Sequence, residues 1–93
     1  MTVQVLLPGV LAALAGGSKH VAVEPAGDSL GDVLDALAAT HPMLARRIRD
    51  ETGQVRRFVN VYVDGDDVRF AQGLATPVPD GAVVQVLPSV AGG

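Results

Sequence analysis

The stretch RFVNVYVDG, residues 57–65, predicts a β-strand that ends in a tight turn. Its valines alternate with other side chains, which is the period of two expected of a strand with one buried face. Asp64-Gly65 favours a type I′ hairpin turn, in which both central residues have positive φ. We therefore expect the chain to reverse there, with Val68-Arg69-Phe70 running back as a short strand. The valines are Val59, Val61 and Val63, and Phe58, Asn60 and Tyr62 face the other way.

Three further stretches show strand alternation, working outward from this hairpin. Thr2–Leu7 and Lys19–Glu24 are expected to form a hairpin, because the small apolar residues between them close with the turn signal Gly16-Gly17. Ala82–Leu87 is the last predicted strand and follows a turn at Asp80-Gly81 and a loop over residues 73–79. Pro88 has no N–H group, so it is expected to end the ladder of that strand.

The middle of the chain predicts two helices. Asp28 or Ser29 is suited to cap the first helix, because a short side-chain oxygen accepts the free N–H groups of a first turn. His41-Pro42 should end it, since the residue before a proline disfavours the helical conformation. A short second helix is expected over Met43–Asp50, followed by a loop over residues 51–54. The first helix has one apolar stripe, formed by Leu30, Val33, Leu34 and Leu37.

The order of these elements predicts an α+β fold. A hairpin, a helix and then further strands form the β-grasp, or ubiquitin-like, arrangement: a mixed sheet covered on one face by a helix. The first and last strands are the most apolar and are expected at the centre of the sheet. Because 93 residues suffice for one domain, we expect residues 1–88 to form it and residues 89–93 to be a flexible tail.

Composition excludes several classes of function. The absence of cysteine removes disulfides, thiolate zinc sites and a thiol nucleophile. A net charge of −3 argues against a nucleic-acid partner. The first residues do not resemble a signal peptide, and no stretch approaches the roughly 20 apolar residues that span a bilayer. We therefore expect a cytoplasmic protein that does not associate with membranes.

The sequence closes with Val90-Ala91-Gly92-Gly93. Two glycines have no β-carbons, so such an end can enter a narrow tunnel of another protein. An extended tail would reach on the order of 15–18 Å beyond Pro88. Its carboxylate is an ordinary anion that becomes reactive when another enzyme activates it. The alternative is an inert end, because chain termini are commonly disordered.

Taken together, these features resemble the ubiquitin-like sulfur carriers, which include the small subunit of molybdopterin synthase and the thiamine sulfur carrier. The greatest likeness is to the actinobacterial sulfur carriers of cysteine biosynthesis. The likeness is densest after residue 57. It is carried by residues 57–70, Gly73-Leu74-Ala75-Thr76, Asp80-Gly81 and residues 87–93.

The resemblance implies a carrier that is not itself an enzyme. The Gly93 carboxylate would be adenylated by an E1-like adenylating sulfurtransferase that uses ATP, and then converted to a thiocarboxylate. The sulfur acceptor would be an enzyme such as a pyridoxal-phosphate cysteine synthase, and a metallopeptidase would release the product. The carrier would bind no cofactor or metal and would be a monomer when free. The tail residues that partners would recognise are Ser89, Val90, Ala91 and Gly92.

Two surfaces are candidate contacts for such partners. An apolar docking patch is expected on the open face of the sheet near the tail, although single exposed apolar residues are also ordinary. Basic residues are a candidate electrostatic contact with an acidic rim of a partner, although a solvated helix and loop face is the simpler explanation. The patch is Phe58, Tyr62, Val83 and Leu87, and the basic residues are Arg46, Arg47, Arg56 and Arg57, with Arg49 beside them.

Other chemistry has little support in the sequence. His20 and His41 have no ligand or carboxylate at a useful spacing, and Ser29 and Ser89 have no triad context. The acidic run of Asp64, Asp66 and Asp67 is explained better by a turn than by a calcium loop.

Three alternative functions stay open. A molybdopterin synthase small subunit would use the same tail, within a permanent complex. A protein modifier would be conjugated through Gly93, although Lys19 as the only lysine argues against extensive chains. A small binding module would not need its tail at all.

Overall fold

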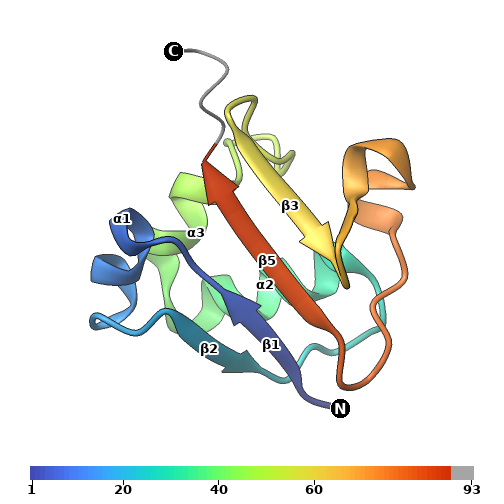
Figure 1. Ribbon diagram of the computed structural model, residues 1–93, viewed down its shortest axis with the longest axis horizontal. Helices are drawn as coiled ribbons and strands as arrows, with labels where there is room; N and C mark the ends of the chain where they lie inside the picture. Colours follow the sequence, from blue (N-terminus) through green and yellow to red (C-terminus); the bar gives the residue numbers. More distant parts are fainter. Residues whose placement is uncertain (89–93) are drawn as a thin grey trace.

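The computed structural model describes residues 1–88, so the predicted tail at residues 89–93 lies outside the described part. Five strands form one mixed sheet in the order β2-β1-β5-β3-β4 (Figure 1). As predicted, the first and last strands are internal, because β5 lies parallel to β1 and antiparallel to β3. The strands are β1 (Val3–Leu6), β2 (His20–Val23), β3 (Val59–Val63), β4 (Asp66–Asp67) and β5 (Val83–Pro88).

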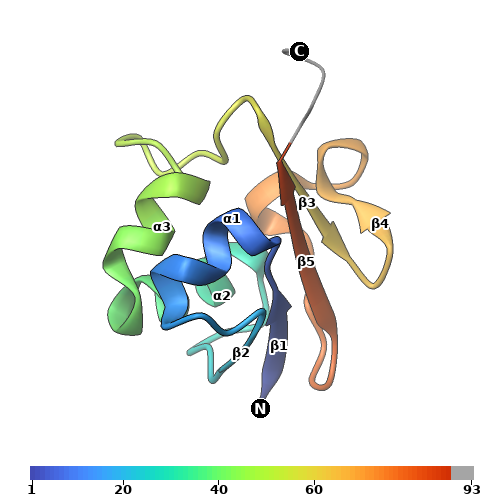
Figure 2. The same cartoon turned by 60° about the vertical axis from the view of Figure 1, so that its left-hand side comes forward.

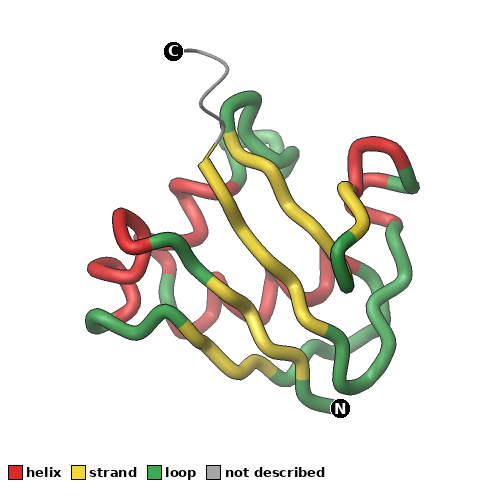
Figure 3. The backbone as a smooth tube through the Cα atoms, viewed as in Figure 1, coloured by secondary structure: helices red, strands yellow, loops and turns green. Residues whose placement is uncertain are grey.

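The helices pack on one side of this sheet, and the other face carries no helix from residues 1–88 (Figure 2). The tube in Figure 3 shows the strands side by side with the helical segments behind them. This is the predicted β-grasp architecture. The helical elements are α1 (Gly9–Ala12), α2 (Leu30–Thr40), α3 (Pro42–Ile48) and three 3₁₀ turns, η1 (Ala13–Ala15), η2 (Val68–Phe70) and η3 (Gly73–Ala75).

The core lies between the sheet and α2 and is entirely aliphatic. The apolar stripe of α2 is buried as predicted, and α3 adds Leu44 and Ile48. The inward valines of β3 and β5 face the helices, with Val59 half-buried at the edge of the core. The sheet residues that are almost completely buried are Val3, Val5, Val61, Val84 and Val86.

Ser29, rather than Asp28, caps α2. The Ser29 hydroxyl oxygen accepts a hydrogen bond from the Asp32 N–H at 3.2 Å, and Asp32 Oδ2 accepts one from the Ser29 N–H at 3.3 Å. This reciprocal capping box satisfies two N–H groups that the helix itself leaves free. The sequence alone left both residues as candidates, and the backbone geometry decides between them.

The link between β1 and β2 is helical, so the expected simple turn was wrong. Alanine and leucine dominate residues 11–15 and have the highest helix propensities. Both α1 and η1 form there, and Gly16 then ends the helical run in a left-handed conformation with φ of 68°. The Gly17 N–H donates to the Ala12 carbonyl at 2.8 Å, which is a typical helix termination.

The reverse turn after β3 is confirmed, but the strand that follows it is shorter than predicted. Asp64 and Gly65 have φ of 50° and 91°, as a type I′ turn requires. Pairing then stops at Asp67, whose side chain accepts the Arg69 N–H at 2.9 Å. Such a local bond competes with the ladder, so Val68–Phe70 is a 3₁₀ turn instead of a strand.

Three other boundaries also differ from expectation. Strand β3 begins at Val59, because the Val59 N–H donates to the Arg56 carbonyl at 3.1 Å and closes a turn over Arg57 and Phe58. Helix α3 ends at Ile48, since the backbone of Arg49 is extended. Strand β5 includes Pro88, which lies opposite Val59 as the last described residue.

Replacing Leu37 with alanine should lower the free energy of unfolding by about 2–5 kcal/mol, because this fully buried side chain would leave a cavity beneath the sheet. Chemical denaturation of both proteins measures the change. Met43→Ala on α3 is the control: Met43 is 59% exposed, so its loss should change stability by less than about 0.5 kcal/mol. Equal effects of the two changes would contradict the assignment of the core.

Ser29→Ala should cost about 1 kcal/mol of stability, because it removes the side-chain half of the capping box. Asp28→Ala is the matched control one residue earlier, where no side-chain cap bond forms, and it should cost less than half as much. Thermal unfolding of both variants under one condition compares them. A larger loss from Asp28→Ala would assign the cap to the other residue.

Candidate functional site

The face of the sheet opposite the helices is left uncovered by the helical elements of residues 1–88 (Figure 2). The strand registers place side chains of four strands on it, with polar and apolar residues intermixed. One row across the sheet runs from His20 through Leu6 and Gln85 to Tyr62. The residues on this face are Gln4, Leu6, His20, Ala22, Asn60, Tyr62, Val83, Gln85 and Leu87.

The residues of the predicted docking patch are spread along this side of the molecule. Leu87 lies opposite Asn60 near the end of β5, and Tyr62 is the next residue of β3 on the same face. Val83 begins β5, four residues before Leu87, which separates the two by about 13 Å along the strand. Phe58 lies in the turn before β3 and is 56% exposed. Only Phe58 and Leu87 are therefore near the end of β5, because Tyr62 lies opposite Gln85 in the middle of the strand and Val83 is at its start.

Two residues of this face had no predicted role, although the sequence contained a signal for one of them. Leu6 is half-buried on the open face. It follows the buried Val5, and successive residues of a strand point to opposite faces of the sheet. Asn60 lies beside Leu87, and its Oδ1 is buried without a hydrogen-bond partner among residues 1–88. A buried acceptor without a partner costs roughly 1–3 kcal/mol. No local sequence pattern marks that feature.

The chain leaves the sheet beside the turn that precedes β3. Pro88 lies opposite Val59, three residues after Arg56. Residue 89 therefore follows a position fixed between the sheet and this turn. The predicted attachment and recognition residues, namely Ser89, Val90, Ala91, Gly92 and Gly93, lie outside the described residues.

Arg49 differs from the other predicted basic residues because its charge is paired. Its Nη1 pairs with Asp35 Oδ1 at 2.7 Å, and its Nε donates to the Gly53 carbonyl at 2.6 Å, so it joins α2 to the loop after α3. Arg56 Nε donates to the Arg46 carbonyl at 2.7 Å, which holds the turn before β3 against the last turn of α3.

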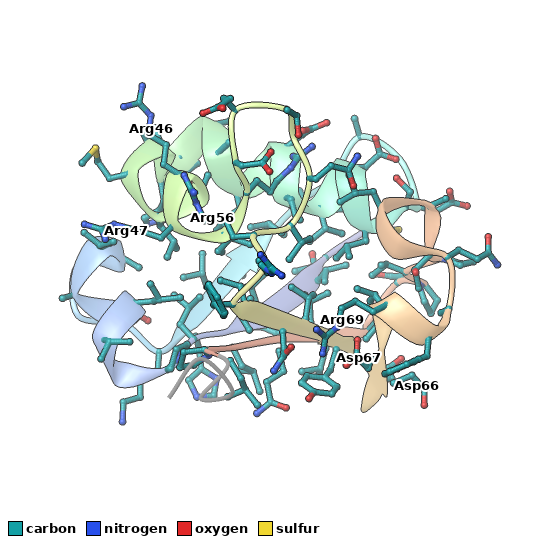
Figure 4. The ribbon with its side chains drawn as sticks, turned by 90° about the horizontal axis from the view of Figure 1, so that it is seen from above. Arg46, Arg47, Arg56, Asp66, Asp67 and Arg69 are labelled. Atoms are coloured by element: carbon teal, nitrogen blue, oxygen red, sulfur yellow. The ribbon has the colours of Figure 1, made fainter. Side chains whose placement is uncertain are left out.

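Arg46, Arg47 and Arg56 consequently lie on the same side of the molecule, away from Asp66, Asp67 and Arg69 (Figure 4). Arg57 stacks its guanidinium 5.9 Å from the centre of the Phe58 ring. The four arginines of the predicted electrostatic contact are thus brought to the end of the molecule where β5 finishes.

The acidic residues after β3 make hydrogen bonds that stabilise the turn. Asp64 Oδ1 accepts the Val83 N–H at 2.9 Å and ties the turn to the start of β5. Asp67 pairs with Arg69 Nη2 at 3.2 Å, and the hydrogen bond from this side chain holds the pKa of Asp67 below its usual value. Within residues 1–88, no three His, Asp or Glu side chains gather as metal ligands would.

The remaining polar candidates are far apart and have structural partners. His41 Nδ1 lies 2.9 Å from the Thr40 hydroxyl at the junction of α2 and α3, whereas His20 is on β2. Ser29 is occupied as the cap of α2. In the described part of the chain, no helix has both the length and the apolar character needed to cross a membrane.

Comparison with known proteins identifies relatives along the whole chain. The model of the ThiS family matches residues 5–93. The sulfur carrier protein CysO of Mycobacterium tuberculosis is 44% identical over 95 residues, which covers 100% of both chains. Small archaeal modifier protein 3 of Haloferax volcanii is 43% identical over 65 residues, or 70% of each chain.

Solved structures agree with this result. The crystal structure of M. tuberculosis CysO superimposes with a TM-score of 0.84 at 42% identity, covering 95% of this chain and 99% of that one. CysO in the Amycolatopsis orientalis BexX/CysO complex gives 0.80 at 39% identity, covering 98% and 99%. With a family match over residues 5–93 and a common β-grasp fold, this chain belongs to the ThiS family of ubiquitin-like sulfur carriers.

Proposed function

We propose that this protein carries sulfur as a thiocarboxylate at Gly93 and donates it in biosynthesis, with cysteine as the expected product. The 44% identity to CysO over 100% of both chains supports this proposal. The diglycine Gly92-Gly93 supplies an end that fits a narrow active site, and the absence of cysteine leaves no side-chain thiol to hold sulfur. The protein acts as a co-substrate of partner enzymes, in the cytoplasm.

The proposed chemistry takes place in two steps on a partner enzyme. An oxygen of the Gly93 carboxylate attacks the α-phosphorus of ATP, and pyrophosphate leaves, so an acyl-adenylate forms. A sulfide-level nucleophile then attacks the activated carbonyl, and AMP leaves with the C–O electron pair. The product is a thiocarboxylate, an acidic group that is ionised and nucleophilic at neutral pH. The partner supplies the catalysis, and this chain supplies the carbonyl carbon.

The position of β5 is the structural observation that supports a carrier role. This strand is hydrogen-bonded to β1 on one side and β3 on the other, and it buries Val84 and Val86 in the core. The proposed reacting end therefore follows, after Pro88, the central strand of the sheet. A partner can bind the folded body and the chain end at the same time, because the joint between them has a fixed position.

Docking is proposed at the end of the open face beside Pro88. Leu87 lies there, and Phe58 projects from the adjacent turn. Tyr62 lies further along the same face, opposite Gln85. The partners are an E1-like adenylating sulfurtransferase, a sulfur-accepting enzyme such as a pyridoxal-phosphate cysteine synthase, and a metallopeptidase that releases the product. A mixed polar and apolar face suits such successive contacts, because permanent interfaces are larger and more apolar.

Conjugation to other proteins is a second candidate function. The observation that favours it is the 43% identity to small archaeal modifier protein 3 over 70% of each chain. A modifier would join Gly93 to lysine side chains of its targets through the same acyl-adenylate. Glycine-glycine remnants on lysines of digested cell protein would identify this activity, whereas a carrier leaves its sulfur on small molecules.

Intact-mass spectrometry tests the proposed attachment. After incubation with ATP, an adenylating sulfurtransferase and sulfide, the wild-type protein should gain the mass difference of sulfur replacing one oxygen, located at Gly93. Gly93→Ala should fold normally and remain unmodified, because its β-carbon obstructs a tunnel shaped for glycine. Modification of the alanine variant at the wild-type rate, or of neither protein by a competent enzyme, would contradict the proposal.

Phe58→Ala should lower kcat/KM for thiocarboxylate formation about tenfold, since an exposed aromatic residue at an interface commonly contributes more than 1 kcal/mol. Phe70→Ala is the matched control, because Phe70 is 87% exposed but lies on η2. Both variants should retain wild-type thermal stability. Similar losses in the two variants would place the docking contact elsewhere.

A further inference from the structure

A cationic surface lies at the end of the molecule where β5 finishes. Pro88 is opposite Val59, whose N–H donates to the Arg56 carbonyl at 3.1 Å. Arg56 in turn donates from Nε to the Arg46 carbonyl at 2.7 Å. These contacts connect Pro88, at the end of β5, to the last turn of α3. Figure 4 views the molecule from that end and shows Arg46, Arg47 and Arg56 gathered there.

These guanidinium groups form no ion pair within the described chain. The ion pairs of residues 1–88 join Arg49 to Asp35 and Arg69 to Asp67, and neither includes the four arginines at this end. A groove of about 460 Å³ is lined entirely by Met43, Arg46, Arg47 and Arg56, without a carboxylate. Arg46 and Arg56 also line a neighbouring groove, together with Asp50 and Glu51.

The distribution of charge is strongly asymmetric as a result. The whole chain has a net charge of −3, with 7 Lys and Arg against 10 Asp and Glu. Four of the cations are Arg46, Arg47, Arg56 and Arg57, so the rest of the chain has 3 cations and 10 acids, a net charge of −7. A field of this kind orients an approaching charged partner, and at low salt it acts over a Debye length of about 30 Å at 0.01 M.

We propose that Arg46, Arg47, Arg56 and Arg57 form an electrostatic docking surface for an Asp- and Glu-rich surface on the enzyme that processes the chain end. This proposal rests on the proposed function, because it deepens the account of how the partner is recognised. The acidic partner surface would attract this end and repel the rest of the molecule. Approach would therefore bring the exit at Pro88 toward the partner's active site, which shortens the search for a productive orientation.

The surroundings of the arginines favour a protein partner over a nucleic acid. Met43 is 59% exposed at the groove, and Phe58 is 56% exposed beneath the Arg57 guanidinium. Protein interfaces combine arginine with methionine and aromatic residues in this manner. A polyanion as long as a nucleic acid would extend beyond the surface and meet the net charge of −7 on the rest of the chain.

The surface can be tested without any partner enzyme. Capped hexaglutamate, added to the full-length ¹⁵N-labelled protein at low salt, should shift the amide signals of residues 43–47 and 56–58, whereas hexaglutamine should not. Arg46→Gln and Arg47→Gln should each weaken hexaglutamate binding about fivefold. Arg69→Gln removes a cation that is already paired with Asp67 and should have a smaller effect. Shifts scattered over the molecule, or tighter binding of a DNA hexamer at the same residues, would overturn the proposal.

The second test uses the enzyme that loads the wild-type protein with sulfur. At low salt, the double variant Arg46→Gln/Arg47→Gln should show at least a tenfold lower kcat/KM for loading, and about 0.5 M NaCl should largely remove the difference. Arg46→Lys/Arg47→Lys keeps the charge and should be close to wild type. A kcat/KM for loading of the double Gln variant equal to that of the wild-type protein at low salt would overturn the proposed docking surface. If the wild-type protein is never loaded, the proposed function fails, and the peptide titration still decides this inference.

Discussion

The parallel pairing of β1 with β5 is the constraint on which the rest of the structure depends. It brings the first and last strands together at the middle of the sheet, with Gln4 opposite Val83. Parallel neighbours need a long connection, and here it contains every other element of the fold, including α2, which covers one face of the sheet. The two strands bury Val3, Val5, Val84 and Val86 against the stripe of α2, so the pairing and the core stabilise each other. The helix-free face and the exit at Pro88 both follow from this arrangement.

The fold therefore separates a stable body from the place where chemistry is proposed. The proposed reacting end follows a strand that is hydrogen-bonded on both edges, while the proposed contacts for partners lie on a face that contributes little to the core. On that face, Leu6, Tyr62 and Leu87 alternate with Asn60 and Gln85. An intermixed surface of this kind suits moderate affinity, because permanent interfaces have larger apolar centres. Moderate affinity lets a carrier dissociate from one enzyme and bind the next.

The two proposed contacts have different physical roles. Short-range packing at Phe58, Tyr62 and Leu87 would determine how long a complex lasts. The arginines at the same end would act earlier, by orienting the encounter, and their effect would decline with salt. Phe58 lies between the two surfaces, since it follows Arg57 and stacks against its guanidinium. A single acidic and apolar strip on a partner could therefore engage both, with the chain exit beside them.

Local patterns in the sequence determined the strands, the stripe of α2, the Asp64-Gly65 turn and hence the β-grasp order, because periods of 2 and 3.6 arise within short segments. The same local rules misjudged residues 10–17 and 68–70, where alanine propensity and the bond from Asp67 to the Arg69 N–H outweighed the expected turn and strand. Only tertiary structure paired Arg49 with Asp35 and held Arg56 against the last turn of α3, beside Arg46. Those outcomes depend on which distant segments pack together, and packing across the sheet and α3 leaves no periodic trace in the chain.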